Sequence, residues 1–375
     1  MERINSIDSV RGMCMWIMIY GHMLDWWINP ADIWFRNWLY AFLEPIGATG
    51  FLFVSGISTS LAFRSSYIKR ETSNNFSVKL TKYSYFFRAF FILLIGFVVN
   101  GFSFLMLKGS IFDIWSWLVL QTIAISLIFS WPFLNKSKPF RIILGLSLIS
   151  VNQIILTFLD PFKGQFNLYG VLFHFLFNPL SQYIILLYFG IFLIGTVLGE
   201  LIFNINISKT QQERLYNFKN KLFKKSLLFG GISIGFGLIF AFPNFLILNT
   251  LSSIIYSMGL ILVLITLLIY RELAEKIKLK RSYRYLYFYS YYSFTIYLGH
   301  YVIYSLFLDQ LNWIIFMILV FGVANAITTF LLRTIYIKLG SKFSLKTGIN
   351  TMSFMLAMKI VKGKQHKTIS LATDI

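Results

Sequence analysis

The sequence predicts an all-α, polytopic transmembrane helix bundle of about ten spans with both termini in the cytoplasm. The 375 residues are 57% hydrophobic and only 13% charged, and their mean hydropathy is +0.70. About a quarter of the residues are charged in an average soluble domain. Apolar runs of membrane length recur along the chain, and the basic residues lie between them.

Ten segments of about 20 residues each are long and apolar enough to cross a bilayer. They cover residues 10–27, 46–63, 87–107, 114–133, 142–159, 183–203, 226–242, 245–270, 290–308 and 313–337. The apolar stretch 168–180 is shorter, so we expect a re-entrant or interfacial segment there. Gly47, Gly50 and Gly56 in the second span predict close packing against a neighbouring helix.

The basic residues predict the topology. With ten alternating spans, 31 of the 34 lysines and arginines fall on one side and only three on the other. Cytoplasmic loops of membrane proteins carry such an excess, so this side is expected to be the cytoplasm. The net charge of +20 is therefore explained by topology, and we expect no nucleic-acid partner.

The chain divides into one membrane domain and a tail. Residues 1–340 are expected to form an integral membrane domain of a multi-pass protein of the cell membrane. Residues 341–375 are expected to form a basic cytoplasmic tail that lies along anionic lipid. The single cysteine, Cys14, allows no internal disulfide. No P-loop, GxSxG, HExxH or zinc-type cysteine–histidine spacing occurs, so no metal site is expected.

The first span carries the residues of greatest chemical interest. Ionisable groups within a membrane-length apolar segment are costly and indicate function by default. Arg11, Met15, Met18, His22 and Asp25 follow 4-3-4-3 spacing and share one helix face. Arg11 and His22 are about 16 Å apart along such a helix. The helix is thus suited to link a charged ligand at the surface to chemistry inside the membrane.

Several roles follow from these residue types. His22 is a candidate general base or nucleophile, and Asp25 is a candidate to orient its ring; the alternatives are a packed histidine and an interfacial carboxylate. His300, within the ninth span, is expected either to contact substrate or to form an interhelical hydrogen bond. Arg11 and Arg88 lie at helix ends, where they either grip a phosphorylated ligand or serve only as topology signals.

Three segments resemble a known group of enzymes. RINSIDSVRGMCMWIMIYGH (residues 3–22) resembles the first-span motif of integral-membrane acyltransferases. These are the heparan-α-glucosaminide N-acetyltransferase-like family and the related acyltransferase family 3, many of which carry a histidine eleven residues after the arginine. GATGFLFVSGISTSLAF (residues 47–63) resembles their second-span signature, with Ser55 and Gly56, and SYYSFTIYLGHYVIY (residues 290–304) resembles a late-span pattern that contains His300.

The resemblance implies transfer of an acyl group, usually acetyl, from cytoplasmic acetyl-CoA or another acyl-CoA to a sugar, glycolipid or similar acceptor. It implies membrane lipid, the acyl-CoA donor and a carbohydrate or glycolipid acceptor as partners, and it is compatible with a homo-oligomer. The donor-binding candidates are Arg11, Arg88, Ser55 and Gly56, and the catalytic candidates are His22, Asp25 and His300.

One feature departs from the lysosomal heparan enzymes that the resemblance includes. Their active histidine lies in the luminal region after the first span, whereas residues 30–45 contain no histidine, which favours His22. The alternative function is a transporter or flippase with His22, Asp25 and His300 as a proton relay. That function predicts inverted repeats, and none is evident in the sequence. A third alternative is an inactive relative with a sensing or scaffolding role.

Overall fold

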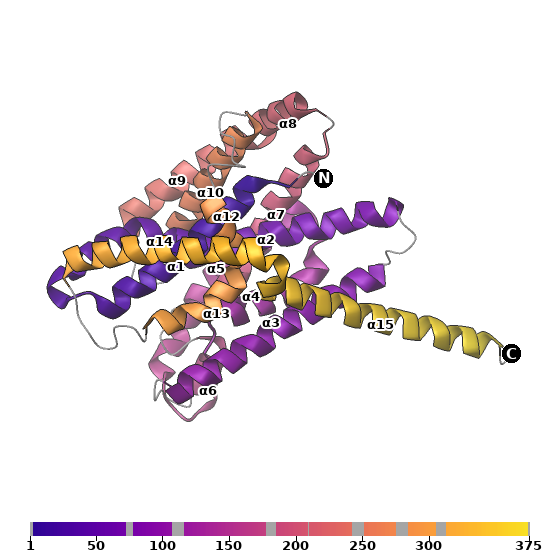
Figure 1. Cartoon of the computed structure of the whole chain (residues 1–375), viewed down its shortest axis with the longest axis horizontal. Helices are drawn as coiled ribbons and strands as arrows, with labels where there is room; N and C mark the ends of the chain where they lie inside the picture. The colour runs from indigo at the N-terminus through magenta and orange to yellow at the C-terminus, as the bar shows by residue number, and fades with distance from the viewer. Residues whose placement is uncertain are drawn as a thin grey trace.

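The computed structural model describes residues 3–72, 78–106, 116–177, 185–208, 210–241, 251–274, 284–304 and 313–373. Within these ranges the protein is a bundle of helices without a β-strand (Figure 1), which confirms the predicted all-α fold. Seven helical segments of the described ranges are long and apolar enough to cross a membrane. They support the predicted multi-pass architecture, whereas the count of ten spans and the side of the termini remain predictions.

The described α-helices are α1 (Asn5–Trp27), α2 (Ile33–Thr72), α3 (Val78–Met106), α4 (Val119–Ser130), α5 (Lys138–Leu159), α6 (Leu168–Leu176), α7 (Ile185–Asn206), α8 (Gln211–Phe218), α9 (Lys224–Ala241), α10 (Leu251–Leu273), α12 (Arg284–Tyr291), α13 (Ser293–Tyr304), α14 (Ile314–Lys338) and α15 (Leu345–Thr373). Each predicted span contains a helix, but α2 begins 13 residues before its predicted span and α4 is shorter than predicted, while α8 and α15 lie outside the predicted spans. The ninth predicted span is divided into α12 and α13, and the short stretch at 168–180 contains the nine-residue α6.

Some predicted span ends cannot be compared with the helices. Residues 107, 114–115, 183–184, 242, 245–250 and 305–308 lie outside the described residues.

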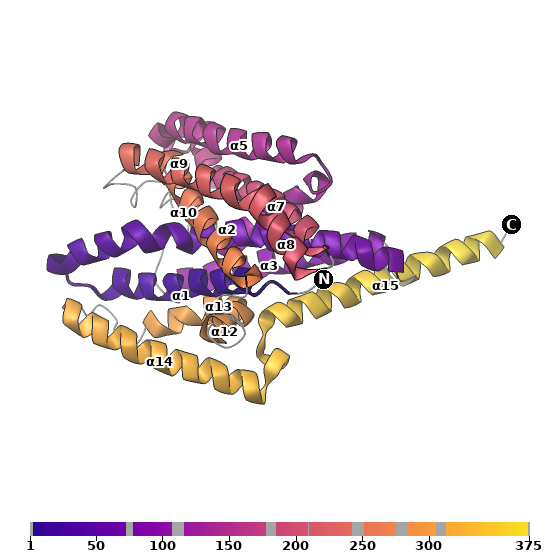
Figure 2. The same ribbon diagram turned by 90° about the horizontal axis from the view of Figure 1, so that it is seen from above.

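Helices α1 and α2 run side by side through the centre of the bundle. Figure 2 shows this pair between α14 on one side and α5, α7 and α9 on the other. Helix α2 packs against α1, α7 and α10, and α1 packs against α12 and α13. Helix α15 contacts α3 near its start and then extends away from the bundle to the C-terminus (Figure 1). The central pair α1 and α2 therefore contacts most of the other helices of the bundle.

A glycine contact fixes the rotation of α2 against α7. A Cβ atom on Gly56 would lie 2.2 Å from the carbonyl oxygen of Phe192, and one on Gly195 would lie 2.3 Å from the carbonyl oxygen of Phe53. Only glycine permits two helix backbones to approach this closely. Because Gly56 faces α7, the side chains of Ser55 and Ser58 face another direction.

Helix α2 continues through Pro45, which directly precedes the predicted second span. Proline has no N–H, so it leaves the carbonyl of the residue four positions earlier without its helical donor. The hydroxyl of Tyr256 on α10 donates to this carbonyl, that of Ala41, at 3.2 Å. A side chain from another helix thus replaces the lost bond, as happens in membrane helices, and α2 extends from residue 33 to residue 72.

The start of α1 is held by a carboxylate from α10. Its N-cap residue, Ile4, has no side chain that can accept a hydrogen bond. The carboxylate of Glu272 accepts from the backbone N–H groups of Asn5 and Ser6, each at 2.8 Å, and from both of their side chains. Because the first N–H groups of a helix lack internal partners and favour an anion, Glu272 fixes where α1 begins.

Candidate functional site

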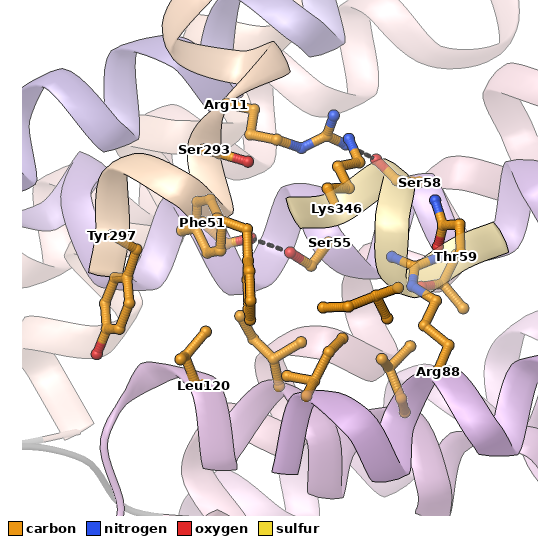
Figure 3. Close-up of a pocket in the computed structure, with 16 residues that line it drawn as sticks. Arg11, Phe51, Ser55, Ser58, Thr59, Arg88, Leu120, Ser293, Tyr297 and Lys346 are labelled. Carbon is orange, nitrogen blue, oxygen red and sulfur yellow. Dashed lines mark hydrogen bonds between the residues drawn. The ribbon is translucent and has the colours of Figure 1, made fainter. Parts of the chain in front are cut away.

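A pocket of about 270 Å³ lies among α1, α2, α3, α4, α13 and the start of α15 (Figure 3). Its size is near the lower end of the range for small-molecule sites, roughly 300–1,000 Å³. Its polar lining includes Arg11, Ser55, Ser58, Thr59, Arg88, Ser293, Lys346 and Asn350, and the rest of the lining is aromatic or aliphatic. The pocket thus combines cations with an apolar wall, which suits a ligand with a charged end and an extended neutral part.

Three cations from three helices gather at the pocket. Arg11 forms an ion pair with Asp8 at 3.1 Å and donates a hydrogen bond to Ser58. Arg88 and Lys346 form no ion pair with any residue that the structure describes. Within the described residues one carboxylate therefore balances three positive groups, and this end of the pocket is complementary to a polyanion.

The neighbouring positive charges affect the pKa of Lys346. The nearby Arg11 guanidinium, burial and the charge of Arg88 together hold the pKa of Lys346 well below its usual range. Like charges in a poorly hydrated space disfavour a further proton. An anion in the pocket would reverse this effect.

The motif that begins α1 explains how Arg11 reaches the pocket. Asp8 pairs with both Arg3 and Arg11 and accepts a hydrogen bond from Ser290 on α12 at 3.3 Å. A Cβ atom on Gly12 would lie 1.9 Å from the carbonyl oxygen of Leu286, so only glycine lets α12 approach at this point. The aspartate and the Arg-Gly pair thus aim one side chain into the pocket while α12 closes on the other face.

Of the four predicted donor-binding residues, the structure brings three together. Arg11, Ser55 and Arg88 line the same pocket. Gly56 does not line it, because it faces α7. Two neighbouring residues of a helix point about 100° apart, so the face that carries Ser55 toward the pocket turns Gly56 away from it.

Sequence reasoning missed further lining residues. Ser58 lies one turn after Ser55 on the same face of α2, and this spacing was a usable signal. Lys346 looked like one more lysine of a basic tail, and nothing in its local sequence distinguishes it. The tail predicted at 341–375 therefore contributes its first two helical turns to the pocket wall.

The second group of predicted site residues lies farther along α1. The rings of His22 and His300 are stacked with centroids 5.3 Å apart and an interplanar angle of 20°. The Trp26 ring stacks on both, with its centroid 5.4 Å from that of His22 and 6.0 Å from that of His300. Two histidines that are 278 positions apart therefore form one cluster, and Trp26, one turn after His22, joins them.

Tyr297 connects this cluster to the pocket. It lines the pocket and its ring centroid is 5.6 Å from that of His300. Figure 3 shows Tyr297 at the end of the pocket opposite Arg88. The backbone carbonyl of Tyr297 lies 2.5 Å from Nδ1 of His300. Since a carbonyl only accepts, Nδ1 carries the hydrogen, and Nε2 of the neutral ring carries the lone pair.

Asp25 lies apart from the ring cluster. Its carboxylate pairs with Arg36 at 3.0 Å, and about a third of each side chain is exposed. His22 forms no hydrogen bond with Asp25 in the described structure. The orienting role of Asp25 therefore stays a prediction, and the structure adds Arg36 as its partner. Among the described residues no group of three or more histidine, cysteine, aspartate or glutamate side chains is arranged to hold a metal ion.

Comparison with known proteins relates the sequence to one family. No curated protein matches the chain significantly. The family described as "Heparan-alpha-glucosaminide N-acetyltransferase, catalytic" matches residues 3–242, which is more than half of the 375 residues. The match includes Arg11, His22 and Arg88, whereas His300 and Lys346 lie beyond it. The protein therefore belongs to the heparan-α-glucosaminide N-acetyltransferase family of membrane acetyltransferases.

Proposed function

We propose that this protein transfers an acetyl group from acetyl-CoA to a sugar or glycolipid acceptor, with His22 as the base. One observation carries the proposal: the cationic pocket is connected through Tyr297 to a stacked pair of histidines. An acyl-CoA transferase needs cations that bind the donor phosphates and, at the other end of the same site, a group that accepts a proton.

The cations are matched to the donor. Coenzyme A carries several phosphate charges at one end and a reactive thioester at the other. Arg11 and Arg88 supply planar guanidinium groups that can bind phosphate oxygens in pairs, and Lys346 adds a point charge. The apolar wall formed by Leu120 and its neighbours suits the extended arm of the donor. Bound in this way, the donor directs its thioester toward Tyr297.

The histidine pair is suited to the transfer step. The acceptor's amino nitrogen or hydroxyl oxygen forms a bond to the acetyl carbon, and His22 takes the proton that this nitrogen or oxygen loses. The carbon–sulfur bond then breaks, and the proton passes from His22 to the departing thiolate of coenzyme A. Transient acetylation of His22 is the alternative sequence of the same bond changes.

The proposed sides of the membrane follow from the charge distribution. Arg11, Arg88 and Lys346 lie where the excess of basic residues predicts the cytoplasm, and acetyl-CoA is too highly charged to cross lipid unaided. His22 lies about 16 Å farther along α1. The acceptor is therefore proposed to approach from the opposite side.

The experiment is a transfer assay with purified protein in nanodiscs. Acetyl-CoA labelled in the acetyl group is offered with amino sugars, hydroxyl-only sugars and glycolipids. We expect label on one acceptor class and one released thiol for each acetyl transferred, and neither product with heat-inactivated protein. A protein that neither binds acetyl-CoA nor releases thiol with any acceptor would contradict the proposal and favour a non-enzymatic role.

A further inference from the structure

A second cationic cluster lies outside the pocket, around Glu200 near the end of α7. Its carboxylate pairs with Arg64 of α2 at 2.7 Å, with Lys138 of α5 at 3.5 Å, and with Arg141 of α5. Arg141 also donates to the hydroxyl of Thr196 at 3.1 Å. One negative group therefore faces three positive groups, and the cluster has a charge excess of two.

Helix α2 separates this cluster from the pocket. Ser55, Ser58 and Thr59 face the pocket. The opposite face carries Gly56 and Ser60 against α7, where a Cβ atom on Gly199 would lie 2.9 Å from Cβ of Ser60. Arg64 follows one turn after Ser60 on this face and meets Glu200. The cluster thus lies about 9 Å beyond Ser58 along α2, toward the end predicted to be cytoplasmic, and the proposed transfer reaction does not use it.

The three cations are not equivalent. The side chain of Arg141 is fully buried, and that of Glu200 is 11% exposed, so these two form the inner, neutralised pair. Arg64 and Lys138 are 27% and 37% exposed. Arg64 shares Oε2 of Glu200 with Arg141 and also donates to the carbonyl of Leu134 at 3.5 Å, whereas Lys138 contacts Oε1. Shared pairs of partly exposed charges are weak. Because both side chains are partly exposed and one carboxylate is shared among three cations, Arg64 and Lys138 can also contact an anion at the surface.

The surface beside them is apolar. Ile142 and Leu146, which follow Lys138 by one and two turns on the neighbouring face of α5, are 37% and 50% exposed. Exposed apolar side chains on a membrane helix face acyl chains. Two partly exposed cations thus lie next to apolar side chains that are expected to face lipid, at the end of α5 that is predicted to be cytoplasmic.

We propose that Arg64 and Lys138 bind the phosphate of an anionic phospholipid headgroup, with the acyl chains lying along Ile142 and Leu146. Arginine binds phosphate oxygens in pairs, and lysine adds a flexible charge. The same phosphate chemistry is offered by inorganic phosphate, but only a lipid uses the adjacent apolar surface. This site is independent of the proposed acetyl transfer, and donor binding is not needed to test it.

The test is a titration of the purified full-length protein in detergent with phosphatidylglycerol, followed by native mass spectrometry, with phosphatidylcholine as the neutral lipid. Lys138→Gln leaves Glu200 paired with Arg64 and Arg141, so the fold should hold. We expect phosphatidylglycerol to bind roughly five-fold more weakly to this variant, and Lys138→Arg to bind as the natural protein does. The matched control is Lys136→Gln, an exposed lysine in the same turn but outside the cluster.

Each result decides the proposal. Selective weakening in Lys138→Gln, repeated in Arg64→Gln, supports it. Unchanged binding in Lys138→Gln, or equal weakening in Lys136→Gln, would show that diffuse surface charge alone attracts the lipid. Millimolar inorganic phosphate that displaces phosphatidylglycerol completely would assign the site to a soluble anion and overturn the lipid proposal.

Discussion

The two ends of α1 are held in different ways. At the Arg11 end, Glu272 caps the helix, Asp8 pairs with the guanidinium, and Ser58 accepts a hydrogen bond from it. At the His22 end, the ring is held by stacking on Trp26 and His300, and no hydrogen bond to a described residue fixes its nitrogens. Directional bonds fix the charged group, whereas ring contacts leave the imidazole nitrogens available for proton transfer.

This contrast predicts that substitutions at the His22 end lower turnover, whereas substitutions at the Arg11 end lower donor affinity. The largest expected effect is that of His22→Ala. Loss of a general base should reduce turnover about 10²–10⁴-fold, and more if the ring is acetylated. The dissociation constant of acetyl-CoA should stay unchanged, because His22 does not line the pocket. Turnover and donor binding are measured on the same nanodisc sample.

His300→Ala provides the internal comparison. If His300 only stacks on His22, its loss should cost less than that of His22. Near-normal turnover in His22→Ala together with a large loss in His300→Ala would reverse the two roles and assign the base to His300.

The second-largest effect is expected for Arg11→Ala, at the charged end of α1. Arg11→Ala removes a charge-assisted contact worth about 1.5–3 kcal/mol, so the dissociation constant of acetyl-CoA should rise roughly 10- to 100-fold. Turnover at saturating donor should change much less. Arg11→Lys should restore little, because lysine cannot bind phosphate oxygens in pairs. Binding is measured by isothermal titration calorimetry.

The matched control for Arg11 is Arg3→Ala. Arg3 pairs with the same Asp8, but 57% of its side chain is exposed and it does not line the pocket. Exposed pairs contribute little, so donor affinity should stay within about two-fold. Equal losses in the two variants would mean that Asp8, and not a direct contact with the donor, sets the affinity.

Sequence patterns located the two ends of α1 because both lie on one helix face. The helical period placed Arg11 and His22 on the same side, and the structure accordingly has Arg11 in the pocket and His22 on His300. The helical period of the sequence does not predict which residue each of these side chains contacts. Asp25 pairs with Arg36 across the α1–α2 turn, and this pairing depends on how the chain reverses.

Residues that depend on long-range packing were missed for the same reason. Lys346 reaches the pocket because the turn before α15 is anchored to α13 and to the residue that precedes it. Tyr292 donates to the carbonyl of Gly340 at 2.7 Å, and Thr295 donates to that of Phe343 at 3.2 Å. In α2, Pro45 is tolerated because Tyr256 comes from another helix. Hydropathy and local spacing carry no information about such contacts.

A third, smaller effect concerns the stack itself. Trp26→Ala should lower turnover about 2- to 12-fold, the equivalent of about 0.5–1.5 kcal/mol for an aromatic contact, without changing donor affinity. Trp26→Phe should recover most of the activity, because it keeps a ring against His22 and His300. A purely structural tryptophan would instead lower the amount of folded protein in both variants and leave the turnover per folded molecule constant.

The smallest effect is a pH dependence at the charged end. In the empty pocket the pKa of Lys346 is held well below its usual range, first by Arg11 and then by burial. Donor phosphates would raise that pKa again, so donor binding takes up a proton between the two values, and affinity should fall as pH rises through this window. Calorimetry between pH 7 and 9, in buffers of different ionisation enthalpy, measures the uptake. Lys346→Gln should abolish it and weaken binding a few-fold, whereas Lys342→Gln, an exposed lysine of the preceding turn, should change neither. Proton uptake that persists in Lys346→Gln would assign the proton to another group of the pocket.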